Sequence, residues 1–332
     1  MQSARRPRVA IITPALAASN TGNWHTAARW ARFLRDRYRV RVTDRWAGDE
    51  ADCLIALHAR RSAASIAAFA AAFPDRPLIV VLTGTDLYRD LAIDAQARQS
   101  LDLATRLVVL NERAPRRLVP RWRRKAQVIL QSATTLAPGR RSARRFDVAV
   151  VGHLRPEKDP QLVWNMLDHL DVGLPVRVWH AGAALDARLG RAARAVERRD
   201  PRYVWLGDLR RGQARQLMRR CHLLLHPSVM EGGAQAVIEA VAAHTPVIGS
   251  RIDGNAGLLG VDYPGWFAVG DAAAAARLVT RAASDPSFWR RLARACARCA
   301  PKFAPARECE AVNRLVHNAL RSATRSAIRS TR

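Results

Sequence analysis

The chain has 332 residues, which exceeds the usual size of one compact domain, so two domains are predicted. Its hydrophobic content of 49% is that of a globular protein, and no apolar run reaches the ~20 residues that a membrane-spanning helix needs, so we expect no stable membrane insertion. The formal charge of +27 favours anionic partners, but no nucleic-acid-binding module or interleaved aromatic pattern accompanies it, so we expect no nucleic-acid partner.

The first half of the chain alternates short apolar strands with helical patterns. The apolar stretch Val9–Ala18 contains a Pro and runs straight into polar Ser19–Asn20, so Val9–Thr13 predicts a buried first strand rather than a signal peptide, which favours a cytoplasmic protein. The predicted strands are Arg8–Pro14, Val40–Thr43, Cys53–His58, Leu78–Thr83, Leu107–Asn111 and Gln127–Leu130. Helical patterns include Trp24–Arg35 and Ser62–Phe73.

The second half repeats this alternation. Its predicted strands are Asp147–Gly152, Val176–Ala181, Tyr203–Leu206, Leu223–His226, Pro246–Gly249 and Trp266–Val269. Its predicted helices lie near Gln161–Leu170, Asp186–Arg198, Gly212–Arg220 and Gly233–Ala243. Continuous apolar strands that alternate with helices indicate parallel sheets covered on both faces, so the fold class is α/β with two doubly wound, Rossmann-like domains.

The composition also predicts the domain boundaries. Residues 1–130 form the first domain, and residues 131–145, which are polar and contain Pro, Gly and several arginines, have the composition of a linker. Residues 146–300 form the second domain. Residues 301–332 are predicted to be a C-terminal helix with a frayed basic tail, in which Val312, Leu315, Val316 and Leu320 form an apolar stripe.

The five cysteines are too few and too scattered to indicate a disulfide framework. Cys296 and Cys299 form a C-x-x-C pattern, which can bind a metal ion or carry out redox chemistry. A single such pair within an Arg- and Ala-rich helix is a weak metal signal, so a structural or incidental role is favoured.

The segment His226–Ala240 (HPSVMEGGAQAVIEA) carries the strongest functional pattern. A strand ends at its start, and a helix is expected to begin near Gly233, where free backbone N–H groups and the helix dipole suit a phosphate. The two glycines, Gly232 and Gly233, leave room for a ligand to approach the backbone. Two carboxylates, Glu231 and Glu239, flank this helix start and can accept hydrogen bonds from sugar and ribose hydroxyls. An ordinary Gly-rich loop with a surface glutamate explains the same residues.

A second segment, Val151–Pro160 (VGHLRPEKDP), follows the first strand of the second domain. Here Arg155 and Lys158 can neutralise a diphosphate. Lysine occurs at only two other positions of the chain, Lys125 and Lys302, so its presence here is notable. The competing interpretation is a charged helix start capped by Asp159.

Three further loops follow predicted strands, where ligands bind in open α/β sheets, and the site is expected in the cleft between the two domains. The loop of Pro14–Trp30 ends in Gly22–Asn23 and suits an anion or an acceptor. In Leu82–Leu91, Thr83, Gly84, Thr85 and Asp86 follow a strand, and Asp86 is either a helix N-cap or a ligand-facing carboxylate. Ser250–Gly260 is a third Gly-rich loop. The histidines that end strands, His58, His153 and His226, are each interpreted as structural hydrogen-bonding residues.

The pattern PS-x-x-EGG, with Glu239 eight residues after Glu231, resembles the E-x7-E signature of family-4 glycosyltransferases of the GT-B fold. The resemblance implies catalytic roles for Glu231, Arg155 and Lys158, and donor-binding roles for Gly232, Gly233, Ala234, Glu239, His153 and Gly207. It implies acceptor-binding roles for Gly22, Asn23, Thr83, Gly84, Thr85 and Asp86. It implies no metal and no bound cofactor, with a UDP-sugar as co-substrate, because such enzymes use basic residues and a helix dipole to stabilise the leaving group.

Five segments have a narrower resemblance, to the selenosugar synthases of selenoneine biosynthesis (SenB type): TGNWHTAARWARFLRD, LTGTDLYRDL, VVGHLRPEKDP, HAGAALD and SRIDGNAGLLGVDYPGWFAVGD. That family joins a UDP-sugar, apparently UDP-N-acetylglucosamine, to selenophosphate and forms a carbon–selenium bond, so the resemblance implies these two partners. Thr83 stands where many family-4 enzymes have His, which fits an acceptor that is already anionic and needs little help from a base.

Two other functions remain open from the sequence. One is an O-glycosyltransferase that acts on a lipid or saccharide hydroxyl. The other is a basic protein on the same fold that binds nucleic acid or phosphate. The sequence carries no signal for an oligomeric state.

Overall fold

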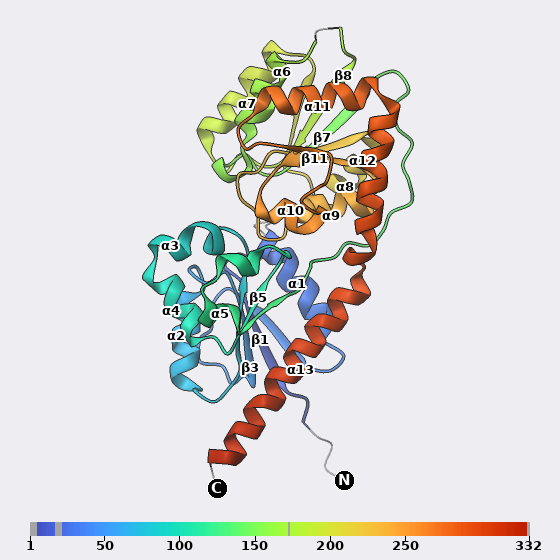
Figure 1. The fold of residues 1–332 in the computed structure, drawn as a ribbon. Coiled ribbons are helices and arrows are strands. Elements are labelled where there is room, and N and C mark those ends of the chain that lie inside the picture. Colours follow the sequence, from blue (N-terminus) through green and yellow to red (C-terminus); the bar gives the residue numbers. More distant parts are fainter. Residues whose placement is uncertain (1–4, 17–21, 172, 331–332) are drawn as a thin grey trace. The chain divides into compact units, whose positions relative to one another are not determined.

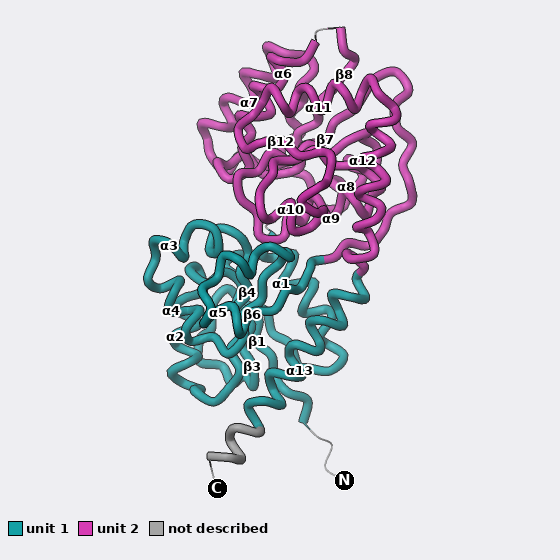
Figure 2. The backbone as a smooth tube through the Cα atoms, viewed as in Figure 1, with its two compact units in different colours: residues 1–131, 305–332 teal, residues 132–304 magenta. Residues whose placement is uncertain are grey.

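The computed structural model describes residues 5–16, 22–171 and 173–330. The chain divides into two compact units (Figure 2): unit 1 is Met1–Gln131 with Pro305–Arg332, and unit 2 is Ser132–Ala304. Unit 2 is therefore inserted into the sequence of unit 1. The segment predicted as a linker, 131–145, belongs to unit 2 apart from Gln131, and the C-terminal helix belongs to unit 1.

Unit 1 contains a parallel sheet, part of which is labelled in Figure 1. It has six strands in the order β2-β1-β3-β4-β5-β6. The strands are β1 (Arg8–Ile12), β2 (Arg39–Thr43), β3 (Cys53–Leu57), β4 (Leu78–Leu82), β5 (Arg106–Val109) and β6 (Ala126–Val128). All six were predicted to within a few residues, because each central strand is a continuous apolar run that is buried on both faces.

Helices cover both faces of this sheet. They are α1 (Gly22–Leu34), α2 (Ala63–Ala72), α3 (Leu91–Ile93), α4 (Ala95–Leu103), α5 (Pro120–Arg123) and α13 (Pro305–Ser330), with short turns η2 (Asp86–Asp90) and η3 (Ala114–Arg117). Alternate residues of β3 enter different cores: Ile55 packs with residues of α1 and α13, and Leu54 packs with residues of α2 and α4. This alternation follows from the two-residue period of a strand.

Helix α13 supplies the apolar stripe that the sequence predicts. Val312, Leu315 and Val316 are buried in the unit 1 core, and Leu320 packs against it. A buried ion pair ties this helix to α1: Arg29 donates from Nε and Nη2 to Glu308 over 2.7 and 3.0 Å, and Trp30 Nε1 donates to the same carboxylate over 2.8 Å. The helix continues to Ser330 rather than fraying after about Arg321.

Unit 2 contains a second six-stranded parallel sheet with the order β12-β11-β10-β7-β8-β9. The strands are β7 (Phe146–Val151), β8 (Val176–Ala181), β9 (Tyr203–Gly207), β10 (Leu223–His226), β11 (Val247–Ser250) and β12 (Trp266–Phe267). The helices are α6 (Pro160–Asp168), α7 (Ala187–Arg199), α8 (Arg211–Arg220), α9 (Gln235–Ala242), α10 (Asp253–Leu259), α11 (Ala272–Ser284) and α12 (Pro286–Cys299), with turns η4 (Pro156–Lys158) and η5 (Ala300–Phe303).

Each sheet has one point at which the strand order reverses. In unit 1 this point lies between β1 and β3, and in unit 2 it lies between β7 and β10. Open α/β sheets bind ligands beside the carboxyl ends of the strands at such points. A ligand is therefore expected beside the loops after β1 and β3 in unit 1, and beside the loops after β7 and β10 in unit 2.

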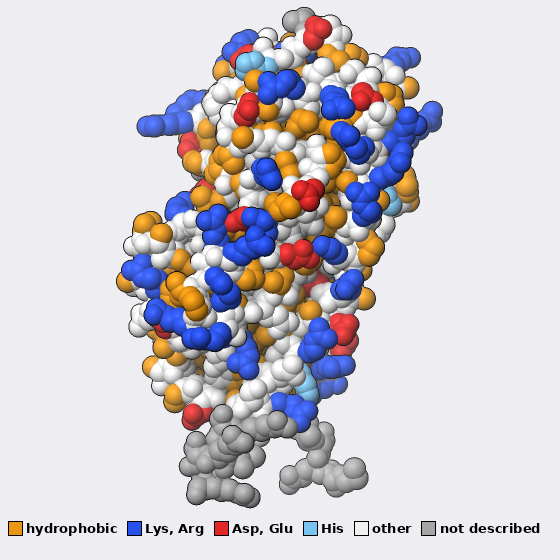
Figure 3. All heavy atoms as spheres, in the orientation of Figure 1, with side chains coloured by type: hydrophobic (Ala, Val, Ile, Leu, Met, Phe, Trp, Pro, Cys, Tyr) orange, Lys and Arg blue, Asp and Glu red, His pale blue; other side chains and the backbone are white. Residues whose placement is uncertain are grey.

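The chain carries a formal net charge of +27. On the face shown in Figure 3, Lys and Arg side chains are spread over both units, and Asp and Glu side chains are scattered among them. Within the described ranges, no helix combines the length and the apolar character required to cross a membrane.

Candidate active site

The loop after β7 brings Lys158 to the reversal point of the unit 2 sheet. The turn η4 ends at Lys158, and Asp159 follows with a left-handed φ of 45°. The carboxylate of Asp159 accepts a hydrogen bond from Leu162 N over 3.1 Å, so it caps α6. The stem of Lys158 lies over Gly152, where a Cβ would come within 3.3 Å of the Lys158 Cδ atom. The interpretation of Asp159 as a helix cap is therefore confirmed, and the binding of a diphosphate by Arg155 and Lys158 stays a prediction.

Glu231 is the partner of Lys158. The loop after β10 places its carboxylate against the Lys158 ammonium, and His226 Nε2 lies 3.2 Å from the same carboxylate oxygen. The Glu231 side chain is only 11% exposed. Burial alone raises the pKa of Glu231, but the ammonium of Lys158 and the ring of His226 outweigh it and hold the pKa below its ordinary range. Glu231 is therefore an ionised carboxylate at neutral pH.

The backbone around Glu231 is fixed from two sides. Val229 N donates to Glu157 O over 3.0 Å, which joins the loop after β10 to the loop after β7. At Gly254, near the start of α10, a Cβ would lie only 2.2 Å from Glu231 O, so no larger residue fits there. The position of the carboxylate thus depends on three separate loops of unit 2.

Helix α9 begins at Gln235, two residues later than predicted. Ala234 adopts a left-handed φ of 30°, which ends the loop and leaves Gly232 and Gly233 outside the helix. All three of these residues are buried. The helix start that the sequence predicts therefore lies two residues further along the chain, and phosphate binding by the first amides of α9, which have no partner within the helix, stays a prediction.

Glu239 lies on α9 and already has a charged partner. Arg211 Nε donates to Glu239 Oε1 over 2.6 Å, and Gln235 Nε2 approaches the same oxygen at 3.3 Å. The carboxylate is 6% exposed. Sequence reasoning missed Arg211, since one arginine at a helix start does not stand out in a chain with so many. Its place after β9, at the carboxyl edge of the sheet, was the only signal available.

The remaining donor-side residues lie on neighbouring loops. Arg155 has a buried Nε without a hydrogen-bond partner among the described residues. His153 Nδ1 accepts from Ala183 N over 3.1 Å and so holds the loop after β8. Gly207, with φ of 68°, accepts from Gly182 N over 2.7 Å. The structure brings Lys158 directly to Glu231, whereas His153 and Gly207 shape adjacent backbone.

In the segment predicted to bind the acceptor, Asp86 is fully buried and its side chain stabilises the turn that contains it. Its carboxylate accepts hydrogen bonds from four backbone amides, those of Ala59, Thr83, Gly84 and Leu87, over 2.8–3.2 Å. The sequence left open whether Asp86 is a cap or faces a ligand, and the structure places it within the turn. The segment η2 that follows is π-helical, a geometry that is often found at functional sites.

The loop after β3 contributes a residue that sequence reasoning set aside as structural. His58 is buried, has a left-handed φ of 73°, and places Nε2 2.9 Å from Thr85 Oγ1. Thr83 and Thr85 are both half-buried. Gly22 and Asn23 are the first two residues of α1, and the preceding part of their predicted loop, 17–21, lies outside the described residues.

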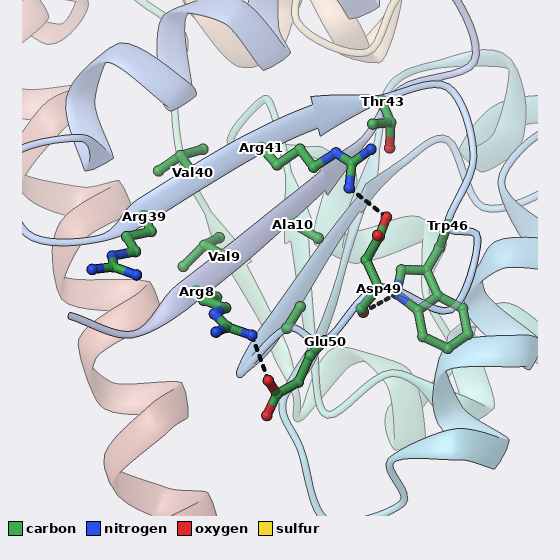
Figure 4. A pocket seen from close by; sticks show the side chains of 11 residues that line it. Arg8, Val9, Ala10, Arg39, Val40, Arg41, Thr43, Trp46, Asp49 and Glu50 are labelled. Carbon is green, nitrogen blue, oxygen red and sulfur yellow. Dashed lines mark hydrogen bonds and ion pairs between the residues drawn. The ribbon is translucent and has the colours of Figure 1, made fainter. Parts of the chain in front are cut away.

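A pocket of about 450 Å³ lies elsewhere in unit 1, over the β1–β2 edge (Figure 4). Four of its charged side chains form two ion pairs: Arg8 with Glu50, and Arg41 Nη1 with Asp49 over 2.6 Å. It is lined by β1, by β2 and by the loop after β2, which contains Trp46, Asp49 and Glu50, and none of the site residues predicted from the sequence is among its lining residues.

The cysteines do not form a metal site in the described part of the chain. Cys296 is buried on α12 with its Sγ 3.3 Å from Tyr263 Oη. No group of three or more His, Cys, Asp or Glu side chains among the described residues is arranged to hold a metal ion.

Two doubly wound parallel six-stranded sheets, one in each unit, form a GT-B fold. Residues 136–302, half of the chain, match the family model described as glycosyl transferases group 1. The chain therefore belongs to the group 1 glycosyl transferases and is a glycosyltransferase.

Solved structures share this fold at low sequence identity. The crystal structure of Alr3699/HepE from Anabaena in complex with UDP and glucose is similar over 95% of this chain and 100% of its own, with 16% identity and a TM-score of 0.76. Sucrose-phosphate synthase (tll1590) from Thermosynechococcus elongatus is similar over 97% and 100%, with 14% identity and a TM-score of 0.76. Comparison with proteins of curated function gives no match.

Proposed function

We propose that this glycosyltransferase transfers a sugar from a UDP-sugar, UDP-N-acetylglucosamine in the first instance, to selenophosphate. The selenium atom attacks the anomeric carbon, a carbon–selenium bond forms, and the bond from that carbon to the diphosphate oxygen breaks with its electron pair leaving on UDP. The immediate product is a sugar whose anomeric selenium still carries the phosphoryl group, and cleavage of the Se–P bond by water releases phosphate and gives a selenosugar of the kind made in selenoneine biosynthesis.

The observation that carries the donor half of this proposal is the cluster at the reversal point of the unit 2 sheet. Lys158 and the unpartnered Nε of Arg155 supply positive charge for a leaving diphosphate, and the start of α9 adds backbone amides. The similar HepE structures contain UDP with glucose, or UDP-glucose, which supports a UDP-sugar as the donor. Glu239 binds the ribose through the oxygen that Arg211 leaves unoccupied.

The acceptor half rests on five segments that resemble the selenosugar synthases and on the residues of the LTGTDLYRDL segment. Thr83 stands where a base is common in related enzymes, and the carboxylate of Asp86 accepts hydrogen bonds from backbone amides of its own turn. A soft anionic nucleophile needs no deprotonation, so a site without a free base suits selenophosphate.

A competition assay tests the acceptor. The full chain is supplied with UDP-N-acetylglucosamine and either selenophosphate or a panel of lipid and saccharide hydroxyls, and products are identified by mass spectrometry. A selenium-containing sugar with release of UDP is expected, and hydroxyl glycosides without it would replace this function with an O-glycosyltransferase. Turnover is expected to survive EDTA, because Arg155 and Lys158 neutralise the diphosphate.

A substitution tests the donor site separately. Glu239→Ala is expected to lose most activity through a raised KM for the UDP-sugar, with selenophosphate KM unchanged. Full turnover in this variant would remove Glu239 from the donor site.

A further inference from the structure

We propose that His58, acting through the hydroxyl of Thr85, makes the carboxyl edge of the unit 1 sheet a binding site for an oxyanion of the phosphate class on the acceptor. This inference rests on the proposed function and deepens it: it names a positioning residue and the chemical group that the residue selects.

The backbone at His58 is held in a conformation that costs free energy. β3 ends at Leu57, and His58 then takes a φ of 73°, which is uncommon for any residue other than glycine. Its side chain is 3% exposed, so the ring is fixed as well. Strained residues of this kind persist where the surrounding structure holds them, and they cluster at functional sites. Strand β3 lies at the reversal point of the unit 1 sheet, and open α/β sheets bind ligands beside the carboxyl ends of the strands at such points.

The hydrogen bonds around the ring determine which nitrogen carries the proton. The amide of Arg61 donates to His58 Nδ1 over 3.3 Å, so Nδ1 is the unprotonated nitrogen of the neutral ring. The proton then lies on Nε2 and is donated to Thr85 Oγ1 over 2.9 Å. Burial lowers the pKa of His58 by more than the nearby carboxylates of Asp86 and Asp90 raise it, with Arg60 and Arg61 acting in the same direction as burial.

This arrangement makes Thr85 a hydrogen-bond donor. Its oxygen accepts from His58, so its single proton is available to a further group, and the described residues contain no other hydrogen-bond partner for it. The hydroxyl of Thr83, two residues earlier, likewise has no hydrogen-bond partner within the described ranges and is half-buried. The oriented hydroxyl of Thr85 favours a ligand atom that offers a lone pair, and the hydroxyl of Thr83 can donate to the same kind of atom. The ring of His58 has no free lone pair with which to act as a base.

The charges around the pair favour an anion. Asp86 is saturated by four backbone amides, and Asp90 is held by Arg60 Nε at 2.9 Å and Arg89 Nε at 3.1 Å. Arg61 is exposed and has no ion-pair partner among the described residues. The two carboxylates that lie 3.9 Å from the ring nitrogens of His58 are therefore engaged by other groups, whereas in the described part of the chain the guanidinium of Arg61 is not. Guanidinium groups match the oxygens of a phosphate, and their donors complement the hydroxyl of Thr85.

Binding of monothiophosphate, a stable analogue of selenophosphate, tests the site directly. The full chain and its variants are titrated by calorimetry with monothiophosphate and, separately, with UDP. Thr85→Val removes the donor without adding volume and is expected to weaken monothiophosphate affinity by roughly tenfold to a hundredfold, the effect of losing a hydrogen bond to a charged group. Thr85→Ser is expected to retain affinity, and UDP affinity is expected to stay unchanged in both.

The role of His58 is tested by its coupling to Thr85. His58→Ala is expected to weaken monothiophosphate binding as Thr85→Val does, the double variant to be no weaker than either single variant, and His58→Gln, which retains an N–H donor, to recover part of the loss. In turnover, the loss is expected in the acceptor KM rather than in the donor KM. Wild-type monothiophosphate affinity in Thr85→Val, or losses that multiply in the double variant, would overturn the proposal.

The test separates this inference from the proposed function. Monothiophosphate binding that depends on Thr85, in a chain that does not turn over selenophosphate, supports the oxyanion site and removes selenophosphate as the acceptor. Selenophosphate turnover that is insensitive to Thr85→Val supports the proposed function and removes the oxyanion site.

Discussion

Lys158→Met separates the structural role of the Lys158–Glu231 pair from its chemical role. The substitution keeps the stem that lies on Gly152 and removes the ammonium, which leaves a carboxylate 11% exposed with only His226 beside it. Breaking a buried ion pair costs about 3–5 kcal/mol, and because the Lys158 side chain retains 20% exposure we expect the lower end, about 3 kcal/mol. The loss of one preorganised charge at the leaving group is expected to lower kcat by about 10²–10³-fold.

The destabilisation should depend on pH with a definite sign. In the wild type the pKa of Glu231 is held below its ordinary value, so the ionised carboxylate contributes stability above the unfolded pKa. Without Lys158, burial dominates and the folded pKa rises above the unfolded value. The variant is therefore expected to be least stable near about pH 8 and to recover towards about pH 5, as Glu231 takes up a proton. Hydrogen exchange of the buried amides of β10 reports unit 2 alone.

A double variant supplies the control. Lys158→Met with Glu231→Gln removes both charges, so stability is expected to return while turnover, measured as UDP release, stays low. If turnover returns together with stability, Lys158 acts only as a structural partner of Glu231 and the donor assignment is refuted.

Three further predictions follow from the contacts. Glu308→Ala leaves the buried Arg29 unpaired and is expected to destabilise unit 1 by about 3–5 kcal/mol. The double variant Arg29→Met with Glu308→Leu, which removes both charges, is expected to recover most of that stability. Amide exchange in α1 measures the stability of each variant, and an equal loss of stability in the two would contradict the prediction. Gly254→Ala forces a Cβ to within 2.2 Å of Glu231 O and is expected to abolish UDP-sugar turnover; a wild-type rate would show that the loop yields. Arg211→Gln is expected to weaken UDP affinity about tenfold by calorimetry, because the charge-assisted hydrogen bond from Arg211 orients the carboxylate of Glu239, the proposed partner of the ribose. Unchanged UDP affinity would exclude this role of Arg211.

The strands were predictable from sequence because their signal is local. Each central strand is a run of apolar residues, and the burial of both faces makes that run continuous, so the two sheets and the fold class followed. The start of α9 was misplaced by two residues because Gly232, Gly233 and Ala234 all suit a helix start, and only the left-handed φ of Ala234 decides among them.

The pairings within the site were not predictable in this way. Arg211 and Glu239 are 28 residues apart, and His58 and Thr85 are 27 apart, so tertiary packing alone sets each distance. An arginine gives no signal in a chain where arginine is the default cation, and a histidine that ends a strand looks structural until its hydrogen bonds are known. Lys158 and Glu231 were found because a rare residue type and a recognisable spacing marked them.

The return of α13 to unit 1 has a consequence for the order in which the chain is made. A ribosome completes all of unit 2 before it begins the helix that carries Glu308, so unit 1 waits for its last element although its strands are the first to emerge. Until then Arg29 lacks its carboxylate, and the apolar face that takes up Val312, Leu315 and Val316 is uncovered. A nascent or truncated chain ending near Ala304 would thus present a finished second unit beside an unfinished first one, and that uncovered face is where a chaperone would be needed.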